Sequence, residues 1–215
     1  MDTKQDTKQD TKQDTKPKKI KAANHKGIFL MVLGILCILA AGGLVLYNRR
    51  QDDIAGRESA LALSRVEAAT SDTLLRGLSN VMPVVQIDGR DYIGRLSIPS
   101  IELDLPILVS WDEEDAMIAP CRFSGSAYAD TMVIAGHNMR AHFSPIKSLE
   151  PGTEILFTDV NGNVFTYELR DVLLLQPEQV EEMVTGDDWD LTLFTCNYGG
   201  AARVTLRCVR TSEDF

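Results

Sequence analysis

Leu191-Thr192-Leu193-Phe194-Thr195-Cys196 and Arg203-Val204-Thr205-Leu206-Arg207-Cys208-Val209 are the two stretches that decide the fold of this chain. The second stretch alternates apolar and polar side chains, which is the period of a β-strand with one buried face. The six residues from Asn197 to Ala202 separate the two runs. If the runs form a hairpin, Arg203 is the arginine nearest to Cys196 along the ladder, and Arg207 is farther away.

The same period of two recurs through the second half of the chain. Ile101, Leu103, Leu105 and Ile107 alternate with polar residues and Pro106, and the proline predicts an edge strand or a bulge. Further strands are expected at 92–98, 131–135, 154–157, 164–170, 172–175, 191–195 and 203–209, with a turn at Asn161-Gly162-Asn163. About eight short strands with only a brief helix near 178–184 predict an all-β fold, as a closed barrel or a sandwich.

An uncharged segment lies near the N-terminus. Residues 28–47 carry no charge over twenty positions, about the ~20 that a helix needs to cross a bilayer. More lysines precede the segment than arginines follow it, which predicts a cytoplasmic N-terminus and a domain outside the cell membrane. A cleaved signal peptide is the alternative, because Ala40-Ala41-Gly42-Gly43 offers small residues. However, the apolar residues continue to Tyr47, which favours an uncleaved anchor.

These features divide the chain into four parts. Residues 1–27 form a polar tail with Asp-Thr-Lys-Gln repeats that is expected to be disordered, 28–47 an anchor, 48–82 a stalk, and 83–215 the folded domain. The domain has nine Lys and Arg against 22 Asp and Glu. Nucleic-acid binding needs a basic surface, so an acidic domain argues against a nucleic-acid partner.

Four cysteines do not make a disulfide framework. Cys37 lies within the predicted anchor, which leaves Cys121, Cys196 and Cys208 in the outer compartment. An odd number leaves at least one thiol unpaired within the molecule. A bridge between Cys121 and Cys208 is one arrangement, and free thiols are the other.

Three residues together predict nucleophilic chemistry. Cys196 ends an apolar strand, so its thiol is expected at the rim of the sheet. His137 follows the strand 131–135, and a guanidinium such as Arg203 can stabilise an oxyanion. Each has a structural alternative: a buried thiol, a histidine bonded within a turn, and a solvated arginine. His142 competes with His137 as the base, but its surroundings have the composition of a surface loop.

The acidic runs are expected to be solvated loops. Asp112-Glu113-Glu114-Asp115, Glu181-Glu182 and Asp187-Asp188 could offer oxygen ligands to calcium, but none has the spacing of a calcium-binding loop. We therefore expect no metal and no cofactor.

At these residues the chain resembles the sortases, membrane-anchored cysteine transpeptidases of Gram-positive bacteria. The family's Thr-Leu-x-Thr-Cys pattern is matched by Thr192 to Cys196, the Ala-Gly-His-Asn segment by 135–138, and the downstream arginine by Arg203. Residues 93–99 also look like the family's first strand.

The resemblance implies an eight-stranded β-barrel and a role for each site residue. Cys196 would be the nucleophile, His137 the general acid and base, Arg203 the stabiliser of the oxyanion and substrate, and Thr195 a substrate-binding residue. Which of Cys196 and His137 holds the proton at rest stays open. In the family's reaction the thiolate attacks the Thr-Gly bond of an LPXTG-like sorting signal on a surface protein, and an amine of a peptidoglycan precursor, or another amine acceptor, resolves the thioacyl enzyme.

Other functions stay open beside this one. A pilin-polymerising sortase is disfavoured, because the Cys196–Arg203 connection is short and no Asp-Pro-aromatic motif precedes the barrel. An L,D-transpeptidase would have a Ser-x-Gly-Cys context, and a papain-like hydrolase would place its cysteine before its histidine. A non-catalytic anchored β-domain that binds a cell-wall partner is the alternative outside catalysis.

Overall fold

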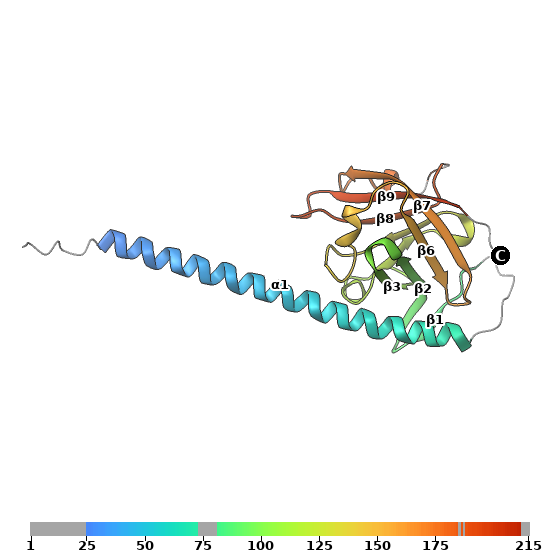
Figure 1. The fold of residues 1–215 in the computed structure, drawn as a ribbon, viewed down its shortest axis with the longest axis horizontal. Helices are drawn as coiled ribbons and strands as arrows, with labels where there is room; N and C mark the ends of the chain where they lie inside the picture. The colour runs from blue at the N-terminus through green and yellow to red at the C-terminus, as the bar shows by residue number, and fades with distance from the viewer. Residues whose placement is uncertain (1–24, 73–80, 185, 187, 212–215) are drawn as a thin grey trace, which may run out of the picture. The chain divides into compact units, whose positions relative to one another are not determined.

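The computed structural model describes residues 25–72, 81–184, 186 and 188–211. Most of the predicted tail, residues 1–24, and the end of the predicted stalk, residues 73–80, lie outside these described residues. The described chain is one long helix followed by a β-barrel with short helices between its strands (Figure 1).

Eight strands close into the barrel. The order is β2-β3-β4-β5-β8-β9-β7-β6, and β6 pairs back onto β2, while β1 adds to the outer side of β2. Closure leaves no free edge within the ring. The strands are β1 Val85–Ile87, β2 Arg90–Ile98, β3 Leu103–Leu108, β4 Cys121–Ser124, β5 Met132–Ala135, β6 Glu154–Asp159, β7 Val164–Leu175, β8 Leu191–Cys196 and β9 Arg203–Arg210. The predicted all-β fold with an eight-stranded barrel is therefore confirmed.

Short helical segments connect the strands. They are the 3₁₀ turns η1 Pro99–Ile101, η2 Asp115–Met117, η3 Ala127–Ala129 and η4 Pro145–Ser148, and the single-turn helix α2 Val180–Met183. Only α2 was expected from the sequence. Pro106 of β3 faces Arg95 of β2, and β3 touches β4 through one bridge, Leu108 to Cys121. β3 therefore pairs along its length with β2 but is nearly an edge strand on its β4 side, which agrees with the edge position that the proline predicts.

The strand predictions fail at three places. β1 and β4 were not expected, and the predicted strands at 164–170 and 172–175 are one strand, β7. The register of β7 against β9 shifts between Leu169 and Asp171, which keeps the strand continuous through the polar pair Arg170-Asp171. A β-bulge of this kind accommodates an extra residue without ending the strand.

The barrel encloses the main core. Its largest fully buried side chains include Ile93, Leu96, Phe143, Phe157 and Phe165. Gly94 has φ +154°, and a Cβ there would lie 2.1 Å from the carbonyl oxygen of Thr158. Only glycine therefore allows β2 to approach β6 closely enough to close the ring.

The N-terminal helix α1 extends from His25 to Asp72. It includes the segment predicted as an anchor, and it is the one helix among the described residues that is long and apolar enough to cross a membrane. The chain divides into two compact units between Val45 and Leu46. Within the second unit, Ala55, Ser59, Ala62 and Val66 are buried at the spacing of one helix face.

Val66 and Ala62 belong to a second cluster. They pack with Tyr92, Leu108, Ala116, Ala119 and Cys121 of the barrel. Beside this cluster, Arg95 Nη1 of β2 lies 2.5 Å from Glu67 Oε1 of α1. Residues 46–72 therefore share a core with the barrel in this unit.

Candidate active site

Cys196 and Arg203 face each other across a hairpin. Cys196 is the last residue of β8 and Arg203 the first of β9, and the two are Cα partners in the antiparallel ladder. The connection is closed by a hydrogen bond from Asn197 N to Ala202 O (2.9 Å) and one from Ala202 N to Asn197 Oδ1 (3.1 Å). The hairpin that the sequence left conditional is formed, and it places the thiol and the guanidinium at the same rim.

His137 reaches the same rim from β5. This strand runs parallel to β8, with Ala135 opposite Phe194, and Gly136 N donates to Phe194 O at 3.1 Å. Parallel neighbours end at the same edge of a sheet, so the residues after β5 lie beside the end of β8. His137 and Cys196 are thereby brought together, although 58 residues separate them in the sequence printed above.

Gly136 permits this geometry by lacking a side chain. A Cβ at this position would lie 2.7 Å from Cδ2 and Cγ of Phe143. Phe143 is fully buried, and its N–H donates to His137 O at 3.2 Å. The aromatic ring under Gly136 therefore supports the backbone that presents His137.

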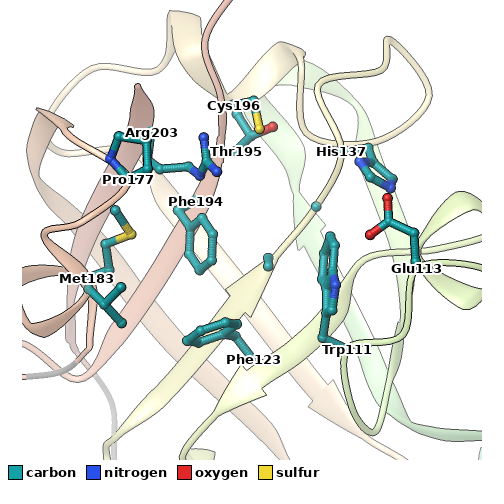
Figure 2. A pocket seen from close by; sticks show the side chains of 13 residues that line it. Trp111, Glu113, Phe123, His137, Pro177, Met183, Phe194, Thr195, Cys196 and Arg203 are labelled. Carbon is teal, nitrogen blue, oxygen red and sulfur yellow. The ribbon is translucent and has the colours of Figure 1, made fainter. Parts of the chain in front are cut away.

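Cys196, His137 and Arg203 line one cavity of about 380 Å³. Figure 2 shows Cys196 between the two other groups, with the Arg203 side chain extending in from one side and His137 on the other. Its remaining walls are mostly apolar and comprise Trp111, Glu113, Phe123, Ala135, Gly136, Pro177, Val180, Met183, Phe194 and Thr195. The cavity combines an apolar lining with a few convergent polar groups, as binding sites usually do.

The three polar groups retain unused hydrogen-bonding capacity. Arg203 Nη1 donates to Gly200 O at 3.1 Å, which leaves the other guanidinium donors for a ligand. The described part of the chain gives His137 Nε2 no hydrogen-bond partner, although this atom is buried. Cys196 and His137 are not hydrogen-bonded to each other within the described residues, and such contacts often tighten only when substrate binds.

Arg207 and His142, the alternatives to Arg203 and His137, do not line this cavity. Arg207 lies four residues along β9, donates to Glu182 O at 2.8 Å, and has its guanidinium carbon 3.9 Å from the Trp189 ring centroid. His142 is fully buried and donates from Nε2 to Ile118 O at 3.1 Å, and desolvation lowers its pKa to about 4. The expectation that His142 lies on a surface loop is wrong, because 139–148 fold as compact turns over the core.

The other two barrel thiols are free and buried. Burial raises the pKa of Cys121 to about 12, and burial likewise raises the pKa of Cys208. Neither thiol can supply a thiolate near neutral pH. The alternative of a bridge between them is not formed, since Cys208 packs inside the barrel and Cys121 packs in the cluster with Val66.

Thr195 lies beside the nucleophile in sequence. Its side chain is buried, its residue lines the cavity, and Oγ1 has no hydrogen-bond partner within the described residues. An unsatisfied buried hydroxyl is costly.

The acidic connection before β4, and β4 itself, supply residues that the sequence did not assign to the site. Trp111 lies 5.4 Å from the His137 ring, centroid to centroid, and Phe123 lies 5.4 Å from Phe194 in the same edge-on arrangement. Figure 2 shows the Glu113 carboxylate pointing toward His137. The run 112–115 was expected to be solvated, yet Asp115 also pairs with Arg90 at 2.8 Å. The one feature of the sequence that could have indicated this part of the site is a tryptophan directly before four acidic residues.

The family follows from comparison with known proteins. Residues 96–212 match the family described as Sortase domain. This chain belongs to the sortase family. It is 27% identical over 188 residues to Sortase A of Bacillus anthracis, a match that covers 80% of this chain and 89% of that protein.

Solved sortases share the fold. Sortase A from Corynebacterium diphtheriae has a TM-score of 0.52 at 20% identity, covering 81% of this chain and 97% of that one. Sortase C-1 from Streptococcus pneumoniae has a TM-score of 0.53 at 21% identity, covering 60% of this chain and 71% of that one. A Clostridium perfringens Sortase D5 transpeptidase has a TM-score of 0.51 at 20% identity, covering 56% of this chain and 79% of that one. The fold and the family support a sortase-type transpeptidase, and these similar scores do not select a subclass.

Proposed function

We propose that this sortase cleaves an LPXTG-like sorting signal through a thioacyl enzyme and transfers the cleaved protein to an amine of the cell wall. The observation that carries the proposal is the pairing of Cys196 with Arg203 at the mouth of a cavity that His137 also lines. A nucleophile, an acid–base group and a fixed cation meet there, as acyl transfer requires.

Each residue has a defined step. The Cys196 thiolate attacks the Thr-Gly carbonyl, and Arg203 stabilises the oxyanion with its free guanidinium donors. His137 protonates the departing glycine amine as the C–N bond breaks, which leaves a thioester on Cys196. The acceptor amine then attacks that thioester, loses a proton to His137, and expels the thiolate.

The walls of the cavity suit the apolar start of such a signal. Phe123, Phe194 and Met183 surround the space beside Cys196 in Figure 2. A leucine or proline side chain buried there loses contact with water, which favours binding. Thr195, with its unpaired buried hydroxyl, is the candidate contact for a polar group of the peptide next to the scissile bond.

The predicted membrane anchor determines which side of the membrane the barrel would face. The apolar part of α1 would cross the cell membrane once, and the lysines before it would keep the N-terminus cytoplasmic. The barrel would then face outward, toward surface proteins that carry a sorting signal and toward peptidoglycan precursors. We place this chain with protein-anchoring sortases rather than pilin polymerases, because its sequence lacks the Asp-Pro-aromatic motif and has a short Cys196–Arg203 connection.

The test uses the full-length protein in detergent micelles. Native protein and a Cys196→Ala variant are incubated with a panel of LPXTG-like peptides, with and without an oligoglycine or diamino acid amine, and intact mass is followed. A Cys37→Ala background removes the exposed thiol of α1 from the readout. We expect an adduct that requires Cys196 and that the amine converts to a transfer product.

Arg203 and Arg207 provide a matched pair from one face of β9. Arg203→Ala should lower the acylation rate roughly 100-fold to 1,000-fold, the usual effect of removing an oxyanion donor. Arg207→Ala should lower stability, through loss of its contacts with Trp189 and Glu182, and leave acylation near the native rate. If no peptide gives an adduct and the Cys196 thiol is unreactive, the non-catalytic binding domain becomes the better assignment.

A further inference from the structure

Lys147 is a second cation, besides Arg203, close to the residues proposed to be catalytic. It is the only lysine after Lys26 in the sequence, and it lies in η4. Its ammonium group donates to Asn138 Oδ1 and lies 3.8 Å from the centroid of the Tyr198 ring. Asn138 directly follows His137, and Tyr198 comes two residues after Cys196, so Lys147 joins the two loops that carry the reactive groups.

Within the part of the chain that the structure describes, the charge of Lys147 has no anionic partner. No carboxylate of the described residues lies within 4.0 Å of its ammonium group, although the domain from 83 to 215 carries 22 acidic residues. Its two partners, an amide oxygen and an aromatic face, are neutral. Lys147 is half-buried, while Tyr198 is 82% exposed. A half-buried cation next to an exposed ring is suited to bind an anion that carries an apolar body.

The position of this group separates it from the peptide cavity. Lys147, Asn138 and Tyr198 do not line the cavity that contains Trp111, Phe123 and Met183. They join the loops that follow Cys196 and His137, which Asn138 Nδ2 connects further by donating to Asn197 O at 3.4 Å. A thioester on Cys196 would have its peptide in the cavity, which leaves the group of Lys147, Asn138 and Tyr198 for the second substrate.

We propose that Lys147 and Tyr198 bind the carboxylate of the acceptor, and that the acceptor is therefore an amine with a free carboxylate nearby, as in a diamino acid. The inference rests on the proposed function. The acceptor nitrogen attacks the thioester carbonyl, the C–S bond breaks, and the amine proton passes to His137. Lys147 takes no part in this exchange of bonds. It positions the nucleophile by holding its carboxylate with an ammonium donor.

The test compares two acceptors that differ only in charge. Full-length protein in micelles is given a saturating LPXTG-like peptide with either 2,6-diaminopimelic acid or its diamide, and transfer is measured against acceptor concentration. We expect the native enzyme to have a KM for the diacid about tenfold below that for the diamide, the scale of one charge-assisted hydrogen bond. Lys147→Met should remove this difference, and Lys147→Arg should keep part of it.

Acylation without an acceptor is the internal control. Because Lys147 contacts Asn138 beside His137, the acylation rate of Lys147→Met is measured separately, and the quantity that tests the inference is the ratio of transfer to the diacid and to the diamide. Tyr198→Ala, at an exposed loop position that does not endanger the fold, should weaken the diacid in the same direction. The inference would be overturned if the native enzyme used both acceptors equally. It would also be overturned if Lys147→Met slowed acylation, transfer to the diacid and transfer to the diamide by the same factor. A native enzyme that forms no thioacyl adduct would instead refute the proposed function, and this inference with it.

Discussion

Substituting Gly136 by alanine should damage the fold and the site through a single contact. The new Cβ would lie 2.7 Å from two ring atoms of Phe143 and 3.2 Å from its Cβ. Gly136 is absent from the glycines with positive φ, so the backbone itself tolerates alanine. The ring cannot retreat, because Phe143 is fully buried among core side chains such as Met132 and Ile146.

The size of the effect follows from this clash. Forcing one extra methyl into a packed core costs about 1–3 kcal/mol. In a domain of this size each kcal/mol lowers the melting temperature by roughly 2–4 °C, so we expect a loss of roughly 2–12 °C. If strand β5 moves instead of the ring, His137 moves with it, and a displacement of about 1 Å can slow the reaction on the order of 100-fold.

Tryptophan fluorescence measures this unfolding without a signal from α1, because both tryptophans, Trp111 and Trp189, belong to the barrel. Phe143→Leu, alone and combined with Gly136→Ala, completes a double-mutant cycle. A leucine at 143 makes room for the new methyl group, so the double variant should be more stable than the two single losses predict. If Gly136→Ala melts within about a degree of the native protein, the contact with Phe143 is not the reason for glycine at this position. Strictly additive stability losses in the double-mutant cycle would lead to the same conclusion.

Two further predictions concern burial. The folded-state pKa of His142, about 4, lies below the 6.5 of an unfolded histidine, so the unfolded chain binds the extra proton and stability falls as pH drops from about 6.5 to about 4. The loss in the free energy of unfolding is at most about 3 kcal/mol. The denaturant midpoint of His142→Gln should therefore fall less over this pH range than that of the native protein. Equal falls in the two midpoints would contradict the role of His142. Val66 is 1% exposed, so Val66→Asp would bury a carboxylate. This should lower the free energy of unfolding by about 3 kcal/mol, which a fluorescence-monitored melt would detect. Leu61→Asp, at a 60% exposed position of the same helix, is the control, and equal melting of the two variants would show that α1 does not pack on the barrel there.

The sequence predicted those parts of the fold that depend on long alternating runs. β8 could be located because it is an apolar run and β9 because its apolar residues recur at period two, and the ends of these strands then indicated Cys196 and Arg203. β1 has three residues and β4 four, which is too short for any period to appear. The polar pair Arg170-Asp171 interrupted the pattern of β7, although Arg170 Nε simply donates to Asp171 Oδ2 at 2.7 Å beside a continuous ladder.

Burial of polar or small residues could not be predicted from the sequence. His142 looked like a surface residue because its hydrogen-bond partner, the carbonyl of Ile118, is 24 residues away. The buried face of α1 was missed because its members include Ala55, Ser59 and Ala62, which carry little hydrophobic signal. Trp111 comes close to His137 through a loop and Lys147 comes close to Asn138 through the short turn η4, and no local pattern specifies the path of either connection.

The position of β9 in the ring has a consequence for when this protein can become active. β9 lies between β8 and β7, both of which precede it in the chain, and it carries Arg203. Until residues 203–210 have emerged and inserted, β7 and β8 have no common neighbour, the ring stays open, and Cys196 has no guanidinium opposite it. The proposed nucleophile is therefore synthesised before its site is complete, and the proposed reaction requires the whole of β9.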